Sequence, residues 1–257
     1  MIRLVSMLRR RASLSLAEFS HLWRKQYAPA VASQQAALGL LRCTLTRNID
    51  DPLADAMRAA RGGMQPPYDG VAEYWWESEE ELRASLRTPV GRAAMATLIR
   101  EEKYHIDSAK STLWFAHEYP QINPSPETAV ARDFSGIVKA HYLLVAAPAL
   151  GAAEARSYWL TQHGPLIRRI NPAIGLLRYQ QVHRFETDLT VLFQQARGME
   201  DTAHMGHAEA WIDMGAMRGG AEAEAANLLA MEDESIFIDF DRSSSWLGKE
   251  EIVVDLL

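Results

Sequence analysis

The chain has 257 residues, 48% of them apolar, so it can bury a substantial core as one large domain or as two smaller ones. Its 27 basic and 33 acidic residues give a formal net charge of −6, and the longest basic run is three arginines at 9–11, which argues against a nucleic-acid-binding surface. The single cysteine excludes an intrachain disulfide and a cysteine-based metal cluster. With no long apolar stretch and no signal-peptide pattern, we expect a cytoplasmic protein without a membrane span.

The first 120 residues predict four strands and two principal helices in the order βαββαβ. Two helix starts carry the spacing of a capping box, Ser15 with Glu18 and Ser78 with Glu81. The first of these helices has an apolar stripe at helical spacing, formed by Leu16, Phe19, Trp23 and Tyr27. Strands are expected at 2–8, 40–47, 71–76 and 112–118, with an additional helical piece at 53–61.

The second half repeats this order at a constant shift of 136 positions. The shift pairs Trp23 with Trp159, Gln26 with Gln162, and Pro29 with Pro165. It also superimposes two copies of Gly-Leu-Leu-Arg, at 39–42 and 175–178, and two copies of Ala-Glu-x-Trp, at 72–75 and 208–211. One ungapped register over this length indicates an internal duplication. Strands are expected at 137–145, 176–184, 207–212 and 251–256, and helical pieces at 152–163 and 189–197.

A βαββαβ unit forms a four-stranded antiparallel sheet with two helices on one face, the ferredoxin-like arrangement. The other face of the sheet needs a partner, which the second copy supplies within the same chain. We therefore expect an α+β protein in which two ferredoxin-like repeats pack sheet to sheet as an intrachain barrel. The repeats are expected at 1–120 and 136–257, joined by an exposed, proline-containing linker at 121–135.

Several segments together resemble the EthD-domain family of the dimeric α+β barrel superfamily. They are Leu-Ser-Leu-x-Glu-Phe at 14–19, Trp-x-x-x-His/Tyr-x-Pro at 23–29 and 159–165, Gly-Leu-Leu-Arg, and Tyr-Asp-Gly-Val-Ala-Glu at 68–73. The resemblance implies a protein that binds or converts a small molecule, because the superfamily includes cofactor-free monooxygenases, isomerases, cyclases, dehydratases and haem enzymes. EthD-type proteins are associated with degradation pathways and dehydratase steps. The family's histidine corresponds to His163, whereas the first copy departs from the motif with Tyr27.

His163 is the principal catalytic candidate. Its spacing from Trp159 places both side chains on the face of the helix that is directed at the sheet. Pro165 disfavours helical conformation at the residue before it, so we expect the helix to end at His163, beside a pocket. An imidazole at that place suits general acid–base catalysis. The structural alternative is a core histidine that hydrogen-bonds a backbone carbonyl or Glu209.

The second copy has histidines on its strands where the first copy has other residues. His141, His183 and His207 replace Val5, Arg47 and Val71, respectively. His207, Glu209 and Trp211 alternate along one strand and should share one face of the sheet. We expect these residues, with Trp159, Tyr179 and Tyr27, to contribute to substrate binding. Taken singly, each strand histidine is better explained as a solvated or interfacial residue, and it is the group that suggests a site.

No cofactor and no metal are expected, because the sequence has no phosphate-binding loop and no closely spaced histidines. Arg42 and Arg178 occupy equivalent strand positions, as do Glu73 and Glu209, so each arginine is expected to neutralise a glutamate on a neighbouring strand. A catalytic alternative is that Arg178 stabilises negative charge on a substrate.

These expectations favour a cofactor-independent lyase (dehydratase) or isomerase acting on an aromatic or polyketide-like compound. His163 would transfer the proton, Tyr158 or Tyr179 would hold a substrate oxygen, and Arg178 would stabilise developing charge. Two alternatives remain open: a non-catalytic protein that binds a hydrophobic small molecule, and a cofactor-free monooxygenase of activated phenols. The sequence does not determine whether the chain forms a homo-oligomer.

Overall fold

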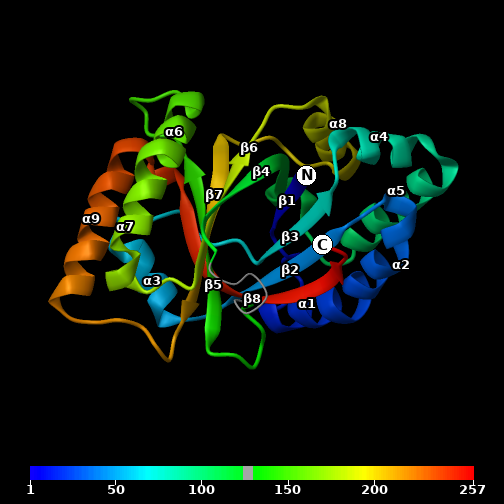
Figure 1. Cartoon of the computed structure of the whole chain (residues 1–257). Helices are drawn as coiled ribbons and strands as arrows, with labels where there is room; N and C mark the ends of the chain where they lie inside the picture. Colours follow the sequence, from blue (N-terminus) through cyan, green and yellow to red (C-terminus); the bar gives the residue numbers. More distant parts are fainter. Residues whose placement is uncertain (124–129) are drawn as a thin grey trace.

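Both halves of the chain contribute to one closed eight-stranded antiparallel barrel in the computed structural model, which describes residues 1–123 and 130–257 (Figure 1). The strand order around the barrel is β1-β3-β2-β8-β5-β7-β6-β4. The strands of the first half are β1 (Ile2–Leu8), β2 (Arg42–Ile49), β3 (Gly70–Trp76) and β4 (Thr112–Ile122). Those of the second half are β5 (Ile137–Val145), β6 (Arg178–Arg184), β7 (His204–Asp213) and β8 (Ser244–Asp255).

The two repeats are joined through the edges of their sheets. Strand β2 pairs with β8, and β4 pairs with β6, both antiparallel, so each four-stranded sheet closes on the other. Within the repeats, Val5 lies opposite Glu73 just as His141 lies opposite Glu209, which preserves the shift of 136 found in the sequence. The prediction of an α+β fold with two ferredoxin-like repeats and an intrachain barrel is confirmed.

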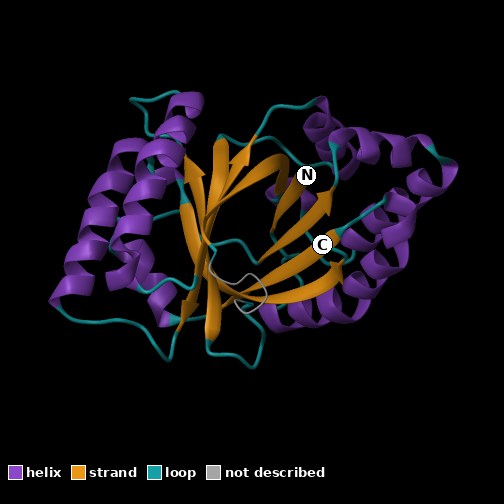
Figure 2. Cartoon of the chain, in the orientation of Figure 1, coloured by secondary structure: helices purple, strands orange, loops and turns teal. Residues whose placement is uncertain are grey.

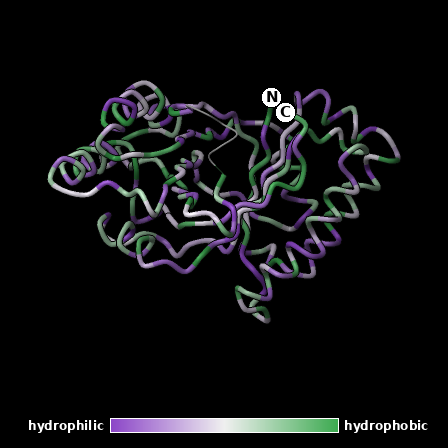
Figure 3. Tube along the Cα trace, turned by 60° about the horizontal axis from the view of Figure 1, so that its bottom comes forward, coloured by the Kyte–Doolittle hydropathy of each residue, from purple (hydrophilic) through white to green (hydrophobic). Residues whose placement is uncertain are grey.

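Two groups of helices cover opposite sides of the barrel (Figures 2 and 3). On the first half lie α1 (Leu16–Leu22), α2 (Ala28–Leu38), α4 (Glu79–Arg87) and α5 (Pro89–Glu102). On the second lie α6 (Ala152–Tyr158), α7 (Gly164–Ile174) and α9 (Ala221–Phe237). Hydrophobic (green) and hydrophilic (purple) stretches alternate along the helices in Figure 3.

One helix of each repeat packs against the core of the other repeat. Helix α3 (Pro52–Ala59) packs in the core of the second half through Ala54, and α8 (Asp188–Arg197) packs in the core of the first half through Leu189 and Phe193. A third apolar cluster, separate from the helices, fills part of the barrel and includes Trp114 and Trp246. The halves are therefore interlocked.

The helix that carries His163 does not end there, and that expectation was wrong. A π-helical turn, Trp159–His163, joins α6 to α7, and the N–H of Gly164 bonds the carbonyl of Trp159. Pro165 then lies in the first turn of α7. The first repeat has the same π-helical turn at Trp23–Tyr27, followed by Pro29 in the first turn of α2.

Other boundaries differ modestly from the expectations. Strand β8 begins at Ser244 rather than at 251, because serines and Gly248 weaken the strand signal of its first half. Strand β4 continues to Ile122, past the expected end of the first repeat. Ser78 caps α4 by accepting the N–H of Glu81, and Ser15 with Glu18 forms a full capping box. Of the expected linker, residues 124–129 lie outside the described residues, and the repeat boundaries stay a prediction.

Within residues 1–123 and 130–257, no helix is both long enough and apolar enough to cross a membrane.

Candidate active site

A cavity of about 340 Å³ lies in the second half, between helices α3, α7 and α9 and the outer face of the sheet. Its wall is largely apolar and includes side chains from both repeats, such as Met57 from α3 and Phe237 from α9. His163, Trp159 and Tyr179 also line it. A partly open, mainly apolar cavity with a few polar groups has the character of a small-molecule site.

The first half is filled where the second half is hollow. The strand register makes Tyr74 correspond to Ala210, since Tyr74 lies opposite Leu4 and Ala210 lies opposite Ala140. Helices α5 and α9 correspond through the bridges that follow them, Arg10 to Ile106 and Ala146 to Ile238.

The same correspondence places Leu98 of α5 at the position of Ala230 of α9. Ala210 and Ala230 both line the cavity, whereas Tyr74 and Leu98 are buried in the core of the first half. Replacement of large side chains by alanine explains why the cavity belongs to the second repeat.

His163 is held by a carboxylate from α9. Its Nδ1 lies 2.7 Å from Oδ2 of Asp233, and the hydroxyl of Tyr158 donates to Oδ1 of the same carboxylate at 2.8 Å. A carboxylate only accepts hydrogen bonds, so Nδ1 carries a proton and, in the neutral ring, Nε2 has the lone pair. Nε2 has no hydrogen-bond partner among the described residues, and the side chain lines the cavity, so this nitrogen is free to meet a ligand.

The protonation states agree with this arrangement. Burial alone would raise the pKa of Asp233, but the hydrogen bonds from His163 and Tyr158 lower it below its ordinary value, which keeps the carboxylate ionised. Burial and the bond to Asp233 raise the pKa of Tyr158 to about 12, so its phenol stays protonated and donates. Tyr158 thus positions Asp233; it is not among the side chains that line the cavity.

Two further polar features lie on the cavity wall. Trp159 Nε1 donates to the hydroxyl of Tyr179 at 3.1 Å. Burial raises the pKa of Tyr179, so its phenol stays protonated and its O–H can donate to a ligand. Arg61 binds both carboxylate oxygens of Glu234, at 2.8 and 3.1 Å. The Arg61–Glu234 pair joins the turn after α3 to α9 and so connects the two repeats at the cavity.

Tyr27, the counterpart of His163, belongs to a closed network in the first half. Its hydroxyl lies 2.6 Å from that of Tyr74 and donates to Oε1 of Glu102 at 2.8 Å. Glu102 is bound in turn by Arg197 of α8, at 2.8 Å. Tyr27 is 1% exposed and does not line the cavity, so the structure does not bring it to the candidate site.

A second group of predicted residues lies inside the barrel, on the opposite face of the sheet. Glu73 and Glu209 are fully buried, and both contact Arg3 and Lys139: Arg3 contacts Glu209 at 2.5 Å, and Lys139 lies 2.6 Å from Glu209 and 3.0 Å from Glu73. Burial alone would raise the pKa of Glu73, but Arg3 and Lys139 hold it at about 2.

The expectation that Arg42 and Arg178 neutralise these glutamates was therefore wrong. The buried cations come from β1 and β5, at positions that the shift of 136 pairs with each other. Arg178 stacks on Trp211, its guanidinium carbon 4.4 Å from the ring centroid, and Arg42 lies near Asp255. Neither arginine lines the cavity.

The strand histidines divide between the two faces. His183 stacks on Trp159 at 4.3 Å on the helix-covered face, and burial and Arg156 lower its pKa to about 3. His141 and His207 lie in the barrel with Glu209, and these three are the described residues whose side chains could together hold a metal. Burial and Lys139 lower the pKa of His141 well below its ordinary range.

Sequence reasoning missed Asp233, Arg3 and Lys139. Asp233 is 70 residues from His163 and is one of several acidic residues in α9, so no local sequence pattern distinguishes it. The shift of 136 pairs Arg3 with Lys139, two cations within apolar strands, and that signal could have found them.

Comparisons with known proteins agree with this architecture. The EthD domain model matches the chain twice, over residues 11–103 and 147–241. A solved structure described as an anthrone oxidase-like protein aligns with a TM-score of 0.55 and 12% identity, over 100% of this chain and 94% of that chain. A structure from Fusobacterium nucleatum, provisionally described as a monooxygenase, aligns with a TM-score of 0.50 and 7% identity, over 98% and 93%. No curated protein matches the chain. At these identities the structural matches show a shared fold.

Proposed function

The chain belongs to the EthD family, as a tandem repeat, and from that premise we propose that it is a cofactor-independent enzyme whose His163 removes a proton from a small molecule in the second-half cavity. The observation that carries the proposal is the hydrogen bond between His163 Nδ1 and Asp233, at 2.7 Å, in the wall of an apolar cavity. It fixes the tautomer that leaves Nε2 basic.

The substrate class follows from the lining. The cavity has the size of a small organic molecule and is walled by aromatic and aliphatic side chains, so we infer an aromatic or polyketide-like substrate. The hydroxyl of Tyr179 would donate to a substrate oxygen that gains negative charge when the carbon acid loses its proton. His163 could then return the proton to a leaving hydroxyl, which gives dehydration, or to another carbon, which gives isomerisation.

A second candidate reaction shares the first step. A substrate carbanion formed by His163 could react directly with molecular oxygen, as in a cofactor-free monooxygenase. The observation that favours it is the full-length likeness to a structure described as anthrone oxidase-like. Because that likeness concerns the fold, the two reactions are to be separated by experiment.

The test is to incubate the purified chain with a panel of anthrones and hydroxylated polyketide-like aromatics, with and without oxygen, and to identify products by mass spectrometry. Loss of water or rearrangement without oxygen supports the lyase or isomerase, and oxygen-dependent gain of oxygen supports the monooxygenase. His163→Phe should reduce the turnover of either reaction by about 10²-fold or more. Tight binding without turnover would instead identify a non-catalytic binding protein and overturn the proposal.

A further inference from the structure

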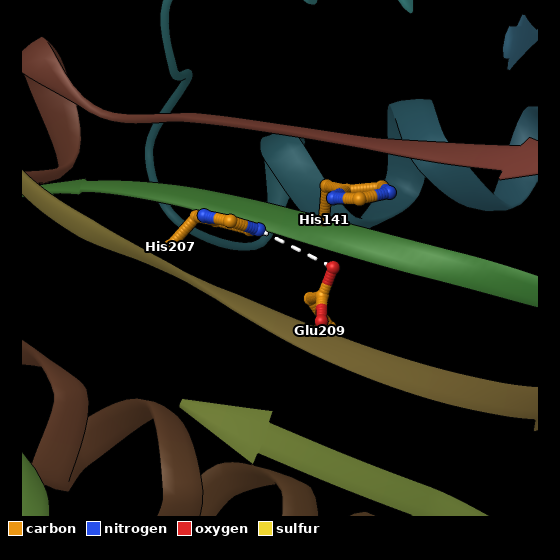
Figure 4. A group of neighbouring side chains, drawn as sticks. All are labelled: His141, His207 and Glu209. Carbon is orange, nitrogen blue, oxygen red and sulfur yellow. Dashed lines mark hydrogen bonds and ion pairs between the residues drawn. The ribbon is translucent and has the colours of Figure 1, made fainter. Parts of the chain in front are cut away.

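Two histidines and a carboxylate converge inside the barrel, away from the cavity (Figure 4). His141 comes from β5, and His207 and Glu209 come from β7; each is 0% exposed, and one ligand atom from each lies within 4.8 Å of the others. His207 Nε2 lies 3.3 Å from Glu209 Oε1.

Much of the hydrogen-bonding capacity of these groups is unused. Both ring nitrogens of His141, Nδ1 of His207 and Oε2 of Glu209 are buried without a hydrogen-bond partner in the part of the chain that the structure describes. A buried polar atom left unpaired costs about 1–3 kcal/mol. Four such atoms in one cluster indicate that the residues have a partner that is not a protein side chain.

We propose that His141, His207 and Glu209 bind one divalent transition-metal ion inside the barrel. Two imidazoles and one carboxylate are a donor set that suits zinc, iron(II), cobalt(II) and similar ions. The oxygen of Glu209 that faces His207 is Oε1 (Figure 4), and Arg3 and Lys139 also contact this oxygen, at 2.5 and 2.6 Å. These contacts also fix the orientation of the carboxylate.

The surrounding charges permit a cation despite the nearby arginine and lysine. Arg3 and Lys139 are matched by Glu73 and Glu209, each of which contacts both cations. Glu250 adds a further carboxylate, 3.1 Å from Lys139. Three carboxylates, those of Glu73, Glu209 and Glu250, thus lie against the two buried cations Arg3 and Lys139.

The first repeat shows that the fold does not require these histidines. It keeps Glu73 at the position of Glu209 but carries Val5 and Val71 where the second repeat has His141 and His207. Apolar side chains therefore satisfy the same packing positions. The expectation of no metal rested on sequence spacing, and the pairing of β5 with β7 brings together residues that spacing keeps apart.

The matched variant is the double substitution His141→Val and His207→Val, which gives the second repeat the residues of the first. Wild type and variant are unfolded with a chelator, refolded with Co²⁺ or Zn²⁺ because the site is closed to solvent, and desalted. Wild type should retain about one equivalent, show a ligand-field spectrum with Co²⁺, and melt at a higher temperature with Zn²⁺. The variant should bind at least about tenfold more weakly.

His163→Phe is the second control, since it alters the cavity but not the barrel; its metal content should equal that of wild type, so this test is independent of the proposed reaction. Glu209→Gln, which preserves side-chain shape, should also weaken Co²⁺ binding and serves if the double variant does not refold. Wild type without bound metal after this treatment, or equal retention by wild type and the refolded variants, would overturn the proposal.

Discussion

His163 and Tyr27 occupy the same position in the two repeats but have different surroundings. Tyr27 donates to Glu102 in a packed core, whereas His163 is held by Asp233 at the wall of a cavity. The residue type and the space around it have changed together. An imidazole can exchange protons with a ligand, whereas a buried phenol such as Tyr27, whose pKa is raised by burial, stays protonated.

Replacing His163 by phenylalanine should therefore reduce turnover about 10²-fold or more, because it removes the proposed base while keeping a ring in the wall. Tyr27→Phe should leave turnover nearly unchanged but lower the free energy of unfolding by about 1–3 kcal/mol, since it breaks the buried hydrogen bond to Glu102. Steady-state kinetics and urea unfolding of both variants check this. Equal losses of turnover would contradict a single working cavity.

Asp233 is expected to act through His163 rather than on the substrate. Asp233→Asn should lower kcat by about tenfold to a hundredfold with little change in KM, because the amide cannot hold the imidazolium as a carboxylate does. Tyr158→Phe is the matched control: it removes the other hydrogen bond to Asp233 and should have a much smaller effect. A larger loss in Tyr158→Phe would assign the catalytic role to the phenol instead.

At the scale of elements, the cavity depends on small side chains in α9. Ala230→Leu introduces the residue that α5 carries as Leu98, so it should fill part of the cavity, weaken ligand binding, and raise the free energy of unfolding by about 1 kcal/mol. Leu98→Ala should instead cost about 2–5 kcal/mol and leave binding unchanged. Calorimetric titration and thermal melts measure both. Unchanged binding in Ala230→Leu would place the ligand elsewhere.

The sequence predicted elements whose signal is local. Strands 2–8 and 137–145 have the predicted bounds, and the capping box at Ser15 forms as expected. The expectation that the helix ends at His163 was wrong. The chain accommodates Pro165 by widening the preceding turn to a π-helical one, and the helix continues. The sequence could not predict that Asp233 is the partner of His163, because the two residues come together only when α9 packs beside α7.

For the whole molecule, buried histidines should set the response to acid. Burial lowers the pKa of His105 to about 4 and that of His183, with help from Arg156, to about 3. Burial and the nearby Arg184 lower that of His204 to about 4. In the unfolded chain their pKa is about 6.5, so the unfolded state binds more protons as the pH falls below this value.

The resulting stability is fully present above pH 6.5 and should be lost as the pH falls through about 4 to 3. Each histidine contributes a slope of up to about 1.4 kcal/mol per pH unit below pH 6. His105→Phe is a matched test, because the second repeat carries Phe237 at the corresponding position and His105 packs against Phe19 and Tyr27. Urea unfolding between pH 7 and pH 5, with a chelator present, measures how the free energy of unfolding changes with pH. The variant should bind up to about one proton fewer on unfolding, which makes this dependence less steep. An unchanged slope would mean that His105 is protonated in the folded state.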